Sequence, residues 1–197
     1  MVITDPVLLK GRDAVAVCRA AAQGGATMIQ VRWKDGAPAE ILELTRALVA
    51  ALPVPVLVND RADIALAAGA AGAHLGWDDP PVEALRPHLP AGFLLGLSVG
   101  SPDEAARAAT SADYWSVGPC FTTPTKHDAG APLGPEGFAA LARLAPEGTS
   151  VIGIGGITAS NARPIIDAGA SGVAVVGAVL GSSNPEMAAR TIRDALT

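Results

Sequence analysis

The chain has 197 residues, of which 50% are hydrophobic and 4% aromatic, and its formal net charge is −5. This length is enough for one well-filled core and too short for two ordinary domains. A net negative chain without a run of Lys or Arg does not attract a nucleic-acid backbone or an anionic membrane surface.

Targeting and redox signals are also absent from the sequence. No apolar stretch is long enough to span a membrane without interruption, and the first residues have neither a basic region nor a cleavage-site pattern. Cys18 and Cys120 form no metal or redox motif, so a disulfide is not expected. We therefore expect a cytoplasmic protein with no membrane or nucleic-acid partner.

The chain alternates short β-branched runs, typical of buried parallel strands, with Ala-rich stretches of helical spacing. In chain order, the predicted strands lie at Val2–Thr4, Met28–Arg32, Val56–Asn59, Ala73–Leu75, Leu94–Ser98, Tyr114–Val117, Val151–Ile154 and Val173–Val176. The predicted helices lie at Asp13–Gly24, Ala39–Leu52, Ala62–Ala68, Val82–His88, Pro102–Thr110, Pro135–Leu144, Ser160–Ala168 and Pro185–Leu196.

This alternation predicts an α/β fold with a parallel sheet and helices outside it. A doubly wound open sheet is the alternative. Eight is the strand number that closes a barrel, and about 200 residues is the small end of the size range for such barrels. We therefore predict a single (β/α)₈ TIM-barrel domain that spans residues 1–197.

Charged and polar residues follow the apolar bodies of the predicted strands, where a closed barrel carries its chemistry. Gln30, Arg32 and Lys34 alternate along the second strand, so their side chains share one face. An Arg and a Lys directed toward the barrel mouth suit an oligophosphate. A solvated strand end with an incidental ion pair is the alternative.

Two carboxylates follow the next two strands. Asp60 and Asp79 lie on neighbouring predicted loops, beside the Lys and Arg. They resemble hard oxygen ligands for Mg²⁺ that is shared with substrate phosphates. Helix capping is the alternative, and Asp78 is the stronger candidate for that role.

The long loop Thr122–Pro132 holds Thr123, Thr125 and Lys126 among prolines and glycines. Hydroxyls, backbone N–H groups and a lysine together form a typical phosphate cradle. A loop of this length in a compact domain is usually functional.

Glycines end the last two predicted strands. Gly155 and Gly156 follow the seventh strand and Gly177 follows the eighth. Bare backbone at these two loops is the common phosphate site of such barrels, whereas a tight turn explains any single glycine. A monophosphate site beside a metal-plus-cation site suggests transfer between two phosphorylated small molecules.

Several segments resemble the thiamine-phosphate synthase family, in order and with compatible spacing over nearly the whole chain. They are Gln30–Lys34, Val58–Arg61, Gly72–Gly76, Asp79-Pro80, Val117–Lys126, Gly153–Ile157 and Gly172–Val176. The most specific of them contains Gly-Pro-x-Phe-x-Thr-x-Thr-Lys at 118–126.

The resemblance implies a transferase of the thiamine-phosphate diphosphorylase type. The family joins hydroxymethylpyrimidine pyrophosphate to hydroxyethylthiazole phosphate, and releases thiamine phosphate and pyrophosphate. In the family the pyrophosphate leaves first, or nearly so, and the thiazole nitrogen captures a stabilised pyrimidine cation. Metal ions and fixed cations stabilise such a leaving group electrostatically.

Residue roles also follow from the resemblance. The pyrophosphate would be held by Arg32, Lys34, Asn59 and Lys126, and three of these, Arg32, Lys34 and Lys126, would be catalytic. Mg²⁺ would be held by Asp60 and Asp79, and Gln30 and Ser98 would contact the pyrimidine side and the pyrophosphate. The thiazole phosphate would be bound by Thr123, Thr125, Gly156, Val176 and Gly177.

The sequence departs from the usual pattern of the family at several positions. Trp33 stands where an acidic residue is usual, Trp77 where a Gln is usual, and Gly177 where a Ser is usual. The segment that begins at Ser98 lacks a His often found near that strand end. Two roles stay open for Trp33 and Trp77, packing on the mouth or lining a contact in a homo-oligomer.

Two other functions compete with the transferase. A related thiazole tautomerase shares the barrel but needs a proton-transfer group and no metal site; a non-catalytic barrel that binds a thiamine precursor would keep the monophosphate site alone. Retention of Lys34, Asp60, Asp79 and Lys126 argues against both.

The three histidines do not favour the tautomerase. His74 lies within an apolar strand and is expected to be a packed core residue. His88 lies at a predicted helix end, where a cation is locally favourable. His127, on the long loop, is the one plausible acid–base candidate.

Overall fold

The structure is a computed structural model, and it describes residues 1–108, 111–123 and 130–197. In these residues eight parallel strands form one sheet in the order of the sequence, from β1 to β8. They are β1 Val2–Ile3, β2 Ile29–Val31, β3 Val56–Asn59, β4 Gly72–Leu75, β5 Leu94–Val99, β6 Tyr114–Val117, β7 Ser150–Ile154 and β8 Gly172–Ala174.

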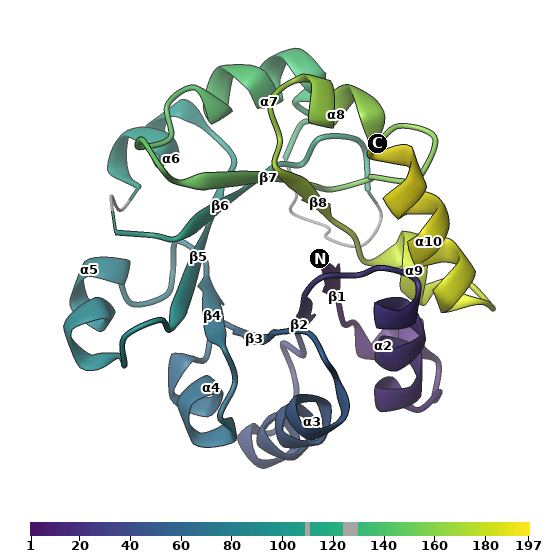
Figure 1. The fold of residues 1–197 in the computed structure, drawn as a ribbon. Helices are drawn as coiled ribbons and strands as arrows, with labels where there is room; N and C mark the ends of the chain where they lie inside the picture. Colours follow the sequence, from purple (N-terminus) through teal and green to yellow (C-terminus); the bar gives the residue numbers. More distant parts are fainter. Residues whose placement is uncertain (109–110, 124–129) are drawn as a thin grey trace.

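The last strand returns to the first. A parallel bridge joins Val2 to Val175, and the N–H of Ile3 donates to the carbonyl of Val175 at 2.9 Å. The sheet therefore closes into a barrel, and Figure 1 shows its strands as an inner ring with helices around it. The predicted TIM barrel is confirmed, and the open sheet is excluded.

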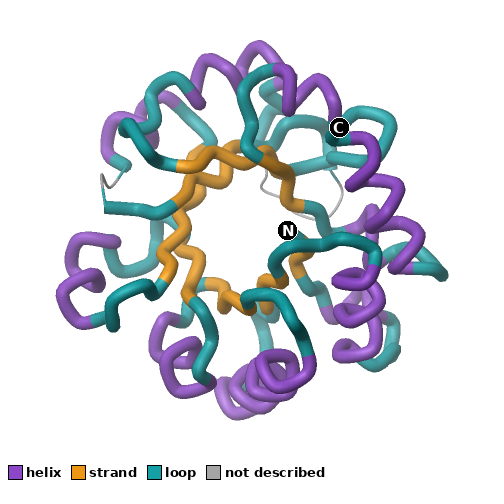
Figure 2. Tube along the Cα trace, viewed as in Figure 1, coloured by secondary structure: helices purple, strands orange, loops and turns teal. Residues whose placement is uncertain are grey.

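Helices follow the strands around the outside, as the tube in Figure 2 shows. In the described ranges they are α1 Pro6–Leu9, α2 Ala14–Gln23, α3 Pro38–Ala51, α4 Ala62–Ala68, α5 Val82–Leu85, the 3₁₀ helix η1 Arg86–His88, α6 Pro102–Arg107, α7 Gly134–Ala142, α8 Arg163–Asp167, α9 Gly177–Leu180 and α10 Pro185–Ala195. None of the described helices is long and apolar enough to cross a membrane.

Two predicted helices differ from the observed ones for local reasons. The segment predicted as one helix over Val82–His88 is α5 followed by η1, because Pro87 lacks an N–H for an α-helical bond. The helix predicted from Ser160 begins at Arg163 instead, because the side chain of Asn161 accepts a hydrogen bond from Thr158 N and holds a turn there.

Two short helices occupy loops where none was predicted. α1 follows β1 and α9 follows β8. The guanidinium of Arg12 donates to the carbonyls of Leu8 and Leu9 at α1, and to those of Leu180 and Ser182 at the C-terminal end of α9. A cation at the carbonyl end of a helix is favourable, so Arg12 fixes α9 against the first loop.

The side chains of the strands pack in two directions. Residues on the outer faces, such as Ile29 and Leu95, pack with helix residues such as Phe138 in the main apolar cluster. Because successive side chains of a strand alternate, Gln30 and Leu57 face the barrel interior, and both are buried. Polar groups are thus held inside the barrel itself.

The apolar layer between strands and helices provides a test of stability. Leu95 is fully buried in this layer, so Leu95→Ala should lower the free energy of unfolding by about 2–5 kcal/mol, through lost burial and a residual cavity. Denaturant unfolding measures the change. Leu144→Ala, at a side chain that is 53% exposed, is the matched control and should change it by no more than about 0.5 kcal/mol.

Candidate active site

The ends of β2 and β3 present a connected pair of amides at the mouth. Gln30 Nε2 donates to Asn59 Oδ1 at 2.9 Å, across neighbouring strands. Gln30 is buried and Asn59 is half-buried, so the buried amide fixes the orientation of the more accessible one. The Asn59 NH₂ group is thereby left to donate in another direction.

Arg32 is held by the first strand and the residue after it. Its backbone N–H donates to Thr4 Oγ1 at 2.9 Å, and its Nη1 lies 3.8 Å from Asp5 Oδ2. Thr4 is buried, whereas the Arg32 side chain is partly exposed at the mouth. Thr4 and Asp5 therefore hold Arg32 in place, a role that their position at the end of the first strand did not indicate.

The carboxylates of Asp60 and Asp79 come together between the loops after β3 and β4, close enough for each to affect the charge of the other. Burial, followed by the proximity of the Asp79 carboxylate, raises the pKa of Asp60 to about 6, although the charges of Lys34 and Arg32 oppose the rise. Two carboxylates so close disfavour each other's charged form. The structure therefore unites the predicted carboxylates and cations in one cluster.

Local backbone geometry sets this cluster. Asp60 has a left-handed backbone with φ of 64°, and its N–H donates to the carbonyl of His74 at 2.8 Å. Asp79 Oδ2 accepts from Gly76 N at 2.6 Å. Neither carboxylate caps a helix, because α4 and α5 have Arg61 and Pro81 at their N-caps, so capping does not explain the pair.

The carboxylate pair supplies two oxygen ligands that a divalent cation could use. Within the described ranges no group of three or more His, Cys, Asp or Glu side chains is arranged to hold a metal ion. Mg²⁺ commonly takes only one or two protein carboxylates and completes its octahedron with waters and substrate phosphates. Asp60 and Asp79, which destabilise each other's charge, therefore fit such an ion.

A second polar cluster lies inside the barrel. His74 Nε2 is 2.9 Å from Ser98 Oγ, and His74 Nδ1 is 2.9 Å from the hydroxyl of Tyr114. Burial lowers the pKa of His74 to about 4, so the ring is neutral at neutral pH. His74 is a buried residue as expected, but its link to Ser98 was not foreseen because it joins residues 24 positions apart.

The loops after β6 and β7 pack closely on each other. Cys120 N donates to Ile154 O at 2.7 Å and Phe121 N to Gly155 O at 2.9 Å. Gly156 has φ of 64°, and a Cβ there would lie 2.5 Å from Thr122 O. Loop packing therefore requires this glycine whether or not a ligand binds, and a phosphate role is an additional proposal.

The loop after β8 leads directly into α9. Val176 is the N-cap of this helix, and Gly177 is its first residue. Thr123 lies at the end of the described part of the loop after β6, whereas Thr125, Lys126 and His127 fall outside the described residues.

The two tryptophans differ in their surroundings. The Trp33 ring lies over Gly36, where a Cβ would be 2.6 Å from the ring, and it packs against the apolar cluster. Trp77 is 39% exposed, and the guanidinium carbon of Arg107 lies 5.5 Å from its ring centroid. Trp33 thus has a packing role in its own turn, and Trp77 makes a cation–π contact.

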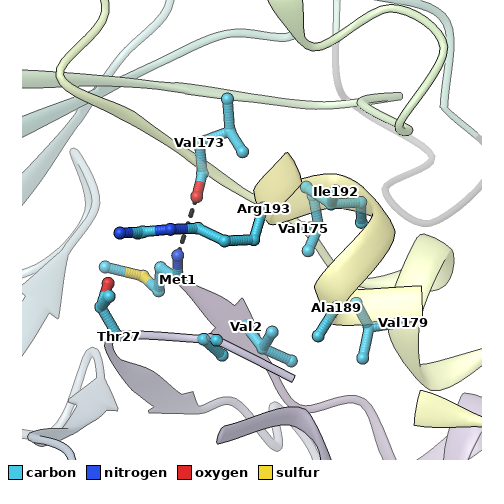
Figure 3. A pocket seen from close by; sticks show the side chains of 11 residues that line it. Met1, Val2, Thr27, Val173, Val175, Val179, Ala189, Ile192 and Arg193 are labelled. Atoms are coloured by element: carbon cyan, nitrogen blue, oxygen red, sulfur yellow. Dashed lines mark hydrogen bonds between the residues drawn. The ribbon is translucent and has the colours of Figure 1, made fainter. Parts of the chain in front are cut away.

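Two cavities lie at the opposite end of the barrel from these groups. One, of about 50 Å³, lies beside Val173 and Arg193, and Figure 3 shows Arg193 reaching across Met1, whose amino group donates to Val173 O at 2.8 Å. The other, of about 380 Å³, is lined by residues at the strand starts, including Leu94 and Tyr114. The charged cluster, rather than cavity size, therefore locates the candidate site.

Comparison with known proteins identifies relatives of the whole chain. The sequence family described as thiamine monophosphate synthase matches residues 1–179. Thiamine-phosphate synthases from Roseiflexus castenholzii and Methanoculleus marisnigri are each 43% identical over 98% of this chain, which covers 86% and 92% of those proteins. The solved thiamine phosphate pyrophosphorylase from Pyrococcus furiosus superposes with a TM-score of 0.87 at 34% identity, over 99% of this chain and 93% of that one.

The buried imidazole predicts a pH-dependent stability. The ordinary pKa of 6.5 falls to about 4 in the folded chain, so between these values the unfolded chain binds a proton that the folded chain does not. The contribution of His74 to the free energy of unfolding therefore falls as the pH is lowered from 6.5 to 4, whereas the contribution of Asp60, whose pKa is raised to about 6, rises as the pH is lowered below 6.

The variant His74→Gln lacks the His74 contribution, so its free energy of unfolding relative to the wild type should rise as the pH is lowered from 6.5 to 4, as denaturant unfolding at a series of pH values would show. His88→Gln, at an exposed histidine, is the control. An unchanged slope in His74→Gln would contradict the lowered pKa.

Proposed function

We infer the reaction of this chain from its family, because the chain belongs to the thiamine monophosphate synthase family. It is a transferase of thiamine biosynthesis, with thiamine-phosphate synthase activity. We propose that it joins hydroxymethylpyrimidine pyrophosphate to hydroxyethylthiazole phosphate, and releases pyrophosphate. The observation that carries the proposal is the cluster of Arg32 and Lys34 with Asp60 and Asp79 at one mouth.

The first chemical step is departure of pyrophosphate from the pyrimidine methylene carbon. The C–O bond breaks and its electron pair leaves with the pyrophosphate, so negative charge grows on the leaving group. Arg32 and Lys34 stabilise that charge, and the Thr4 and Asp5 contacts to Arg32 set its position before the reaction. Asn59, oriented by Gln30, donates to the same group.

Asp60 and Asp79 would hold Mg²⁺ beside these cations. Bound there, the ion neutralises part of the pyrophosphate charge. The two carboxylates contribute to the reaction by fixing this charge at the ends of β3 and β4, next to the side chains that bind the leaving group.

The second step forms the carbon–nitrogen bond. The lone pair of the thiazole nitrogen attacks the cationic methylene carbon, and no proton transfer is needed at that bond. We assign the thiazole phosphate to Thr123, Gly156, Val176 and Gly177. Support comes from α9, a short helix that follows β8 directly, where barrels of this type bind phosphate with free backbone N–H groups.

Residues outside the described ranges enter the proposal through the family resemblance alone. Thr125 is assigned to the thiazole phosphate, and Lys126 to the pyrophosphate as a catalytic cation. Gln30 and Ser98, which are described residues, are assigned to the pyrimidine side and the pyrophosphate, and both lie inside the barrel on strands that border the charged cluster.

Compartment and assembly complete the proposal. Cys18 and Cys120 are free and buried, which suits a reducing cytoplasm. Trp77, with 39% of its surface exposed, is the residue that we assign to a contact in a homo-oligomer.

The decisive assay incubates the protein with both substrates and Mg²⁺ and measures thiamine phosphate and pyrophosphate in equal amounts. Omission of either substrate should abolish both products. Tight binding of the thiazole phosphate without product would identify a binding protein instead, and interconversion of thiazole tautomers would identify a tautomerase.

The metal assignment predicts a specific change in Mg²⁺ dependence. Asp60→Asn should raise the Mg²⁺ concentration for half-maximal activity by about tenfold or more, because one of two carboxylate ligands is lost. Titration of activity with Mg²⁺ measures the shift. Asp78→Asn, at the exposed neighbour of Asp79, is the matched control and should leave the titration unchanged. Coincident curves for all three proteins would refute the assignment.

The cation assignment predicts a loss of turnover. Lys34→Ala should lower kcat by more than about tenfold, because a charge that stabilises the leaving pyrophosphate is removed. Lys126→Ala should have the same effect. Lys10→Ala, at an exposed lysine after α1, is the control in the same assay. A Lys34→Ala enzyme as fast as this control would show that Lys34 does not touch the reacting group.

A further inference from the structure

A chain of hydrogen bonds runs through the barrel interior toward the mouth. Tyr114 is the first residue of β6 and lines the cavity at the strand starts, whereas Ser98 lies one residue before the end of β5. His74, on β4, joins them through its two ring nitrogens at 2.9 Å each. The chain thus links the floor of the barrel to a half-buried hydroxyl at its mouth.

The neighbouring strand is shaped to hold the phenol ring in place. Gly96 pairs with Tyr114 between β5 and β6, and a Cβ at position 96 would lie 2.0 Å from Tyr114 Cζ. The absence of a side chain at Gly96 therefore gives the ring its space. The ring also stacks on His74, with centroids 5.6 Å apart and an angle of 26° between planes.

Hydrogen-bond satisfaction selects one tautomer of His74. Burial, with the charge of Asp113, raises the pKa of the Tyr114 phenol, which therefore keeps its proton. Among the described residues the hydroxyl bonds only to His74 Nδ1, so the phenol can donate its proton within the protein only if Nδ1 carries none. The consistent arrangement has the phenol donating to Nδ1 and Nε2–H donating to Ser98.

This arrangement determines what Ser98 offers to a ligand. Its oxygen accepts from His74 Nε2, so its own proton is available to point elsewhere. In barrel order β5 lies between β4, which precedes Asp79, and β6, which precedes Thr123. The Ser98 hydroxyl is therefore a donor placed between the two proposed anion sites.

We propose that His74 and Tyr114 are positioning residues that hold the Ser98 hydroxyl as a fixed hydrogen-bond donor to the departing pyrophosphate. The inference rests on the proposed function for the identity of the acceptor. A hydrogen bond to a charged group is stronger than one between neutral groups, and a donor already oriented needs no rearrangement as charge develops. His74 itself does not touch the reacting atoms, since both ring nitrogens are occupied within the barrel.

A double-mutant cycle in kcat separates positioning from general support of the fold. Ser98→Ala should lower kcat by about tenfold to hundredfold. The single variant His74→Leu should lose most of the kcat that Ser98→Ala loses. In a chain that already carries Ser98→Ala, adding His74→Leu should lower kcat no further, because His74 acts through the Ser98 hydroxyl. Additive losses would overturn the proposal. The KM for the thiazole phosphate should stay constant throughout, since that ligand binds on the β7 and β8 side.

If His74→Leu folds poorly, more conservative variants can take its place in the same comparison of kcat values. His74→Gln retains an N–H near the Nε2 position and should recover part of the lost kcat. Tyr114→Phe keeps the ring packing and removes the donor to Nδ1, so it should lower kcat severalfold, again only when Ser98 is present. A Tyr114→Phe loss that persists in Ser98→Ala would count against the relay. His88→Gln is the control and should behave as the wild type.

The tautomer can be tested without any substrate. In the ¹⁵N-labelled full chain at pH 7, nuclear magnetic resonance should show His74 with its proton on Nε2 and none on Nδ1, and Tyr114→Phe should shift this balance. A proton on Nδ1 would overturn the inference even in an active enzyme. If the labelled chain shows the expected tautomer but makes no thiamine phosphate, the proposed function has failed and the hydrogen-bond geometry stands.

Discussion

Closure of the parallel sheet is the constraint on which the rest of this structure depends. The bonds between β8 and β1, such as Ile3 N to Val175 O, leave the barrel without a free strand edge along this seam. Parallel strands in a closed ring place all of their carboxyl ends at one mouth. Residues as distant in sequence as Arg32 and Gly177 consequently lie at the same end of the barrel.

The charged side chains lie on one side of that mouth. Arg32, Lys34, Asp60 and Asp79 gather after β2, β3 and β4, and their charges act on one another. In the described residues, the loops after β7 and β8 place Gly156, Val176 and Gly177 at the mouth, and the described start of the loop after β6 ends at Thr123. In the proposed reaction the pyrophosphate binds beside the charged residues, and the thiazole phosphate binds at the backbone N–H groups. A reaction that separates a pyrophosphate from its carbon benefits from such a gradient across a single opening.

The sequence predicted the features that depend on local pattern. β3 and β6 begin and end at their predicted residues, because β-branched and aromatic runs bounded by polar or glycine residues define them well. The gathering of Asp60 with Asp79 followed from barrel closure, since both end adjacent strands. α9 was missed because four residues carry too little periodicity to indicate a helix.

The side-chain contacts inside the barrel could not be predicted from the sequence. His74 lies in a short apolar strand, and the residues next to it in the sequence do not indicate that it forms hydrogen bonds with Tyr114 and Ser98. Such pairs arise from register across strands, which sequence spacing alone does not fix. Thr4 and Asp5 show the intermediate case, because their position after a strand was visible but their target, Arg32, was not.

The lack of a side chain at Gly96 couples the residues that can occur at several distant positions of the sequence. Any side chain at that position would displace the Tyr114 ring, and with it the partner of His74. A lineage that gains a side chain at 96 must therefore shrink residue 114 and accept an imidazole free to exchange tautomers. Positions 74, 96, 98 and 114 should consequently vary together among related sequences, although only position 98 opens onto the mouth.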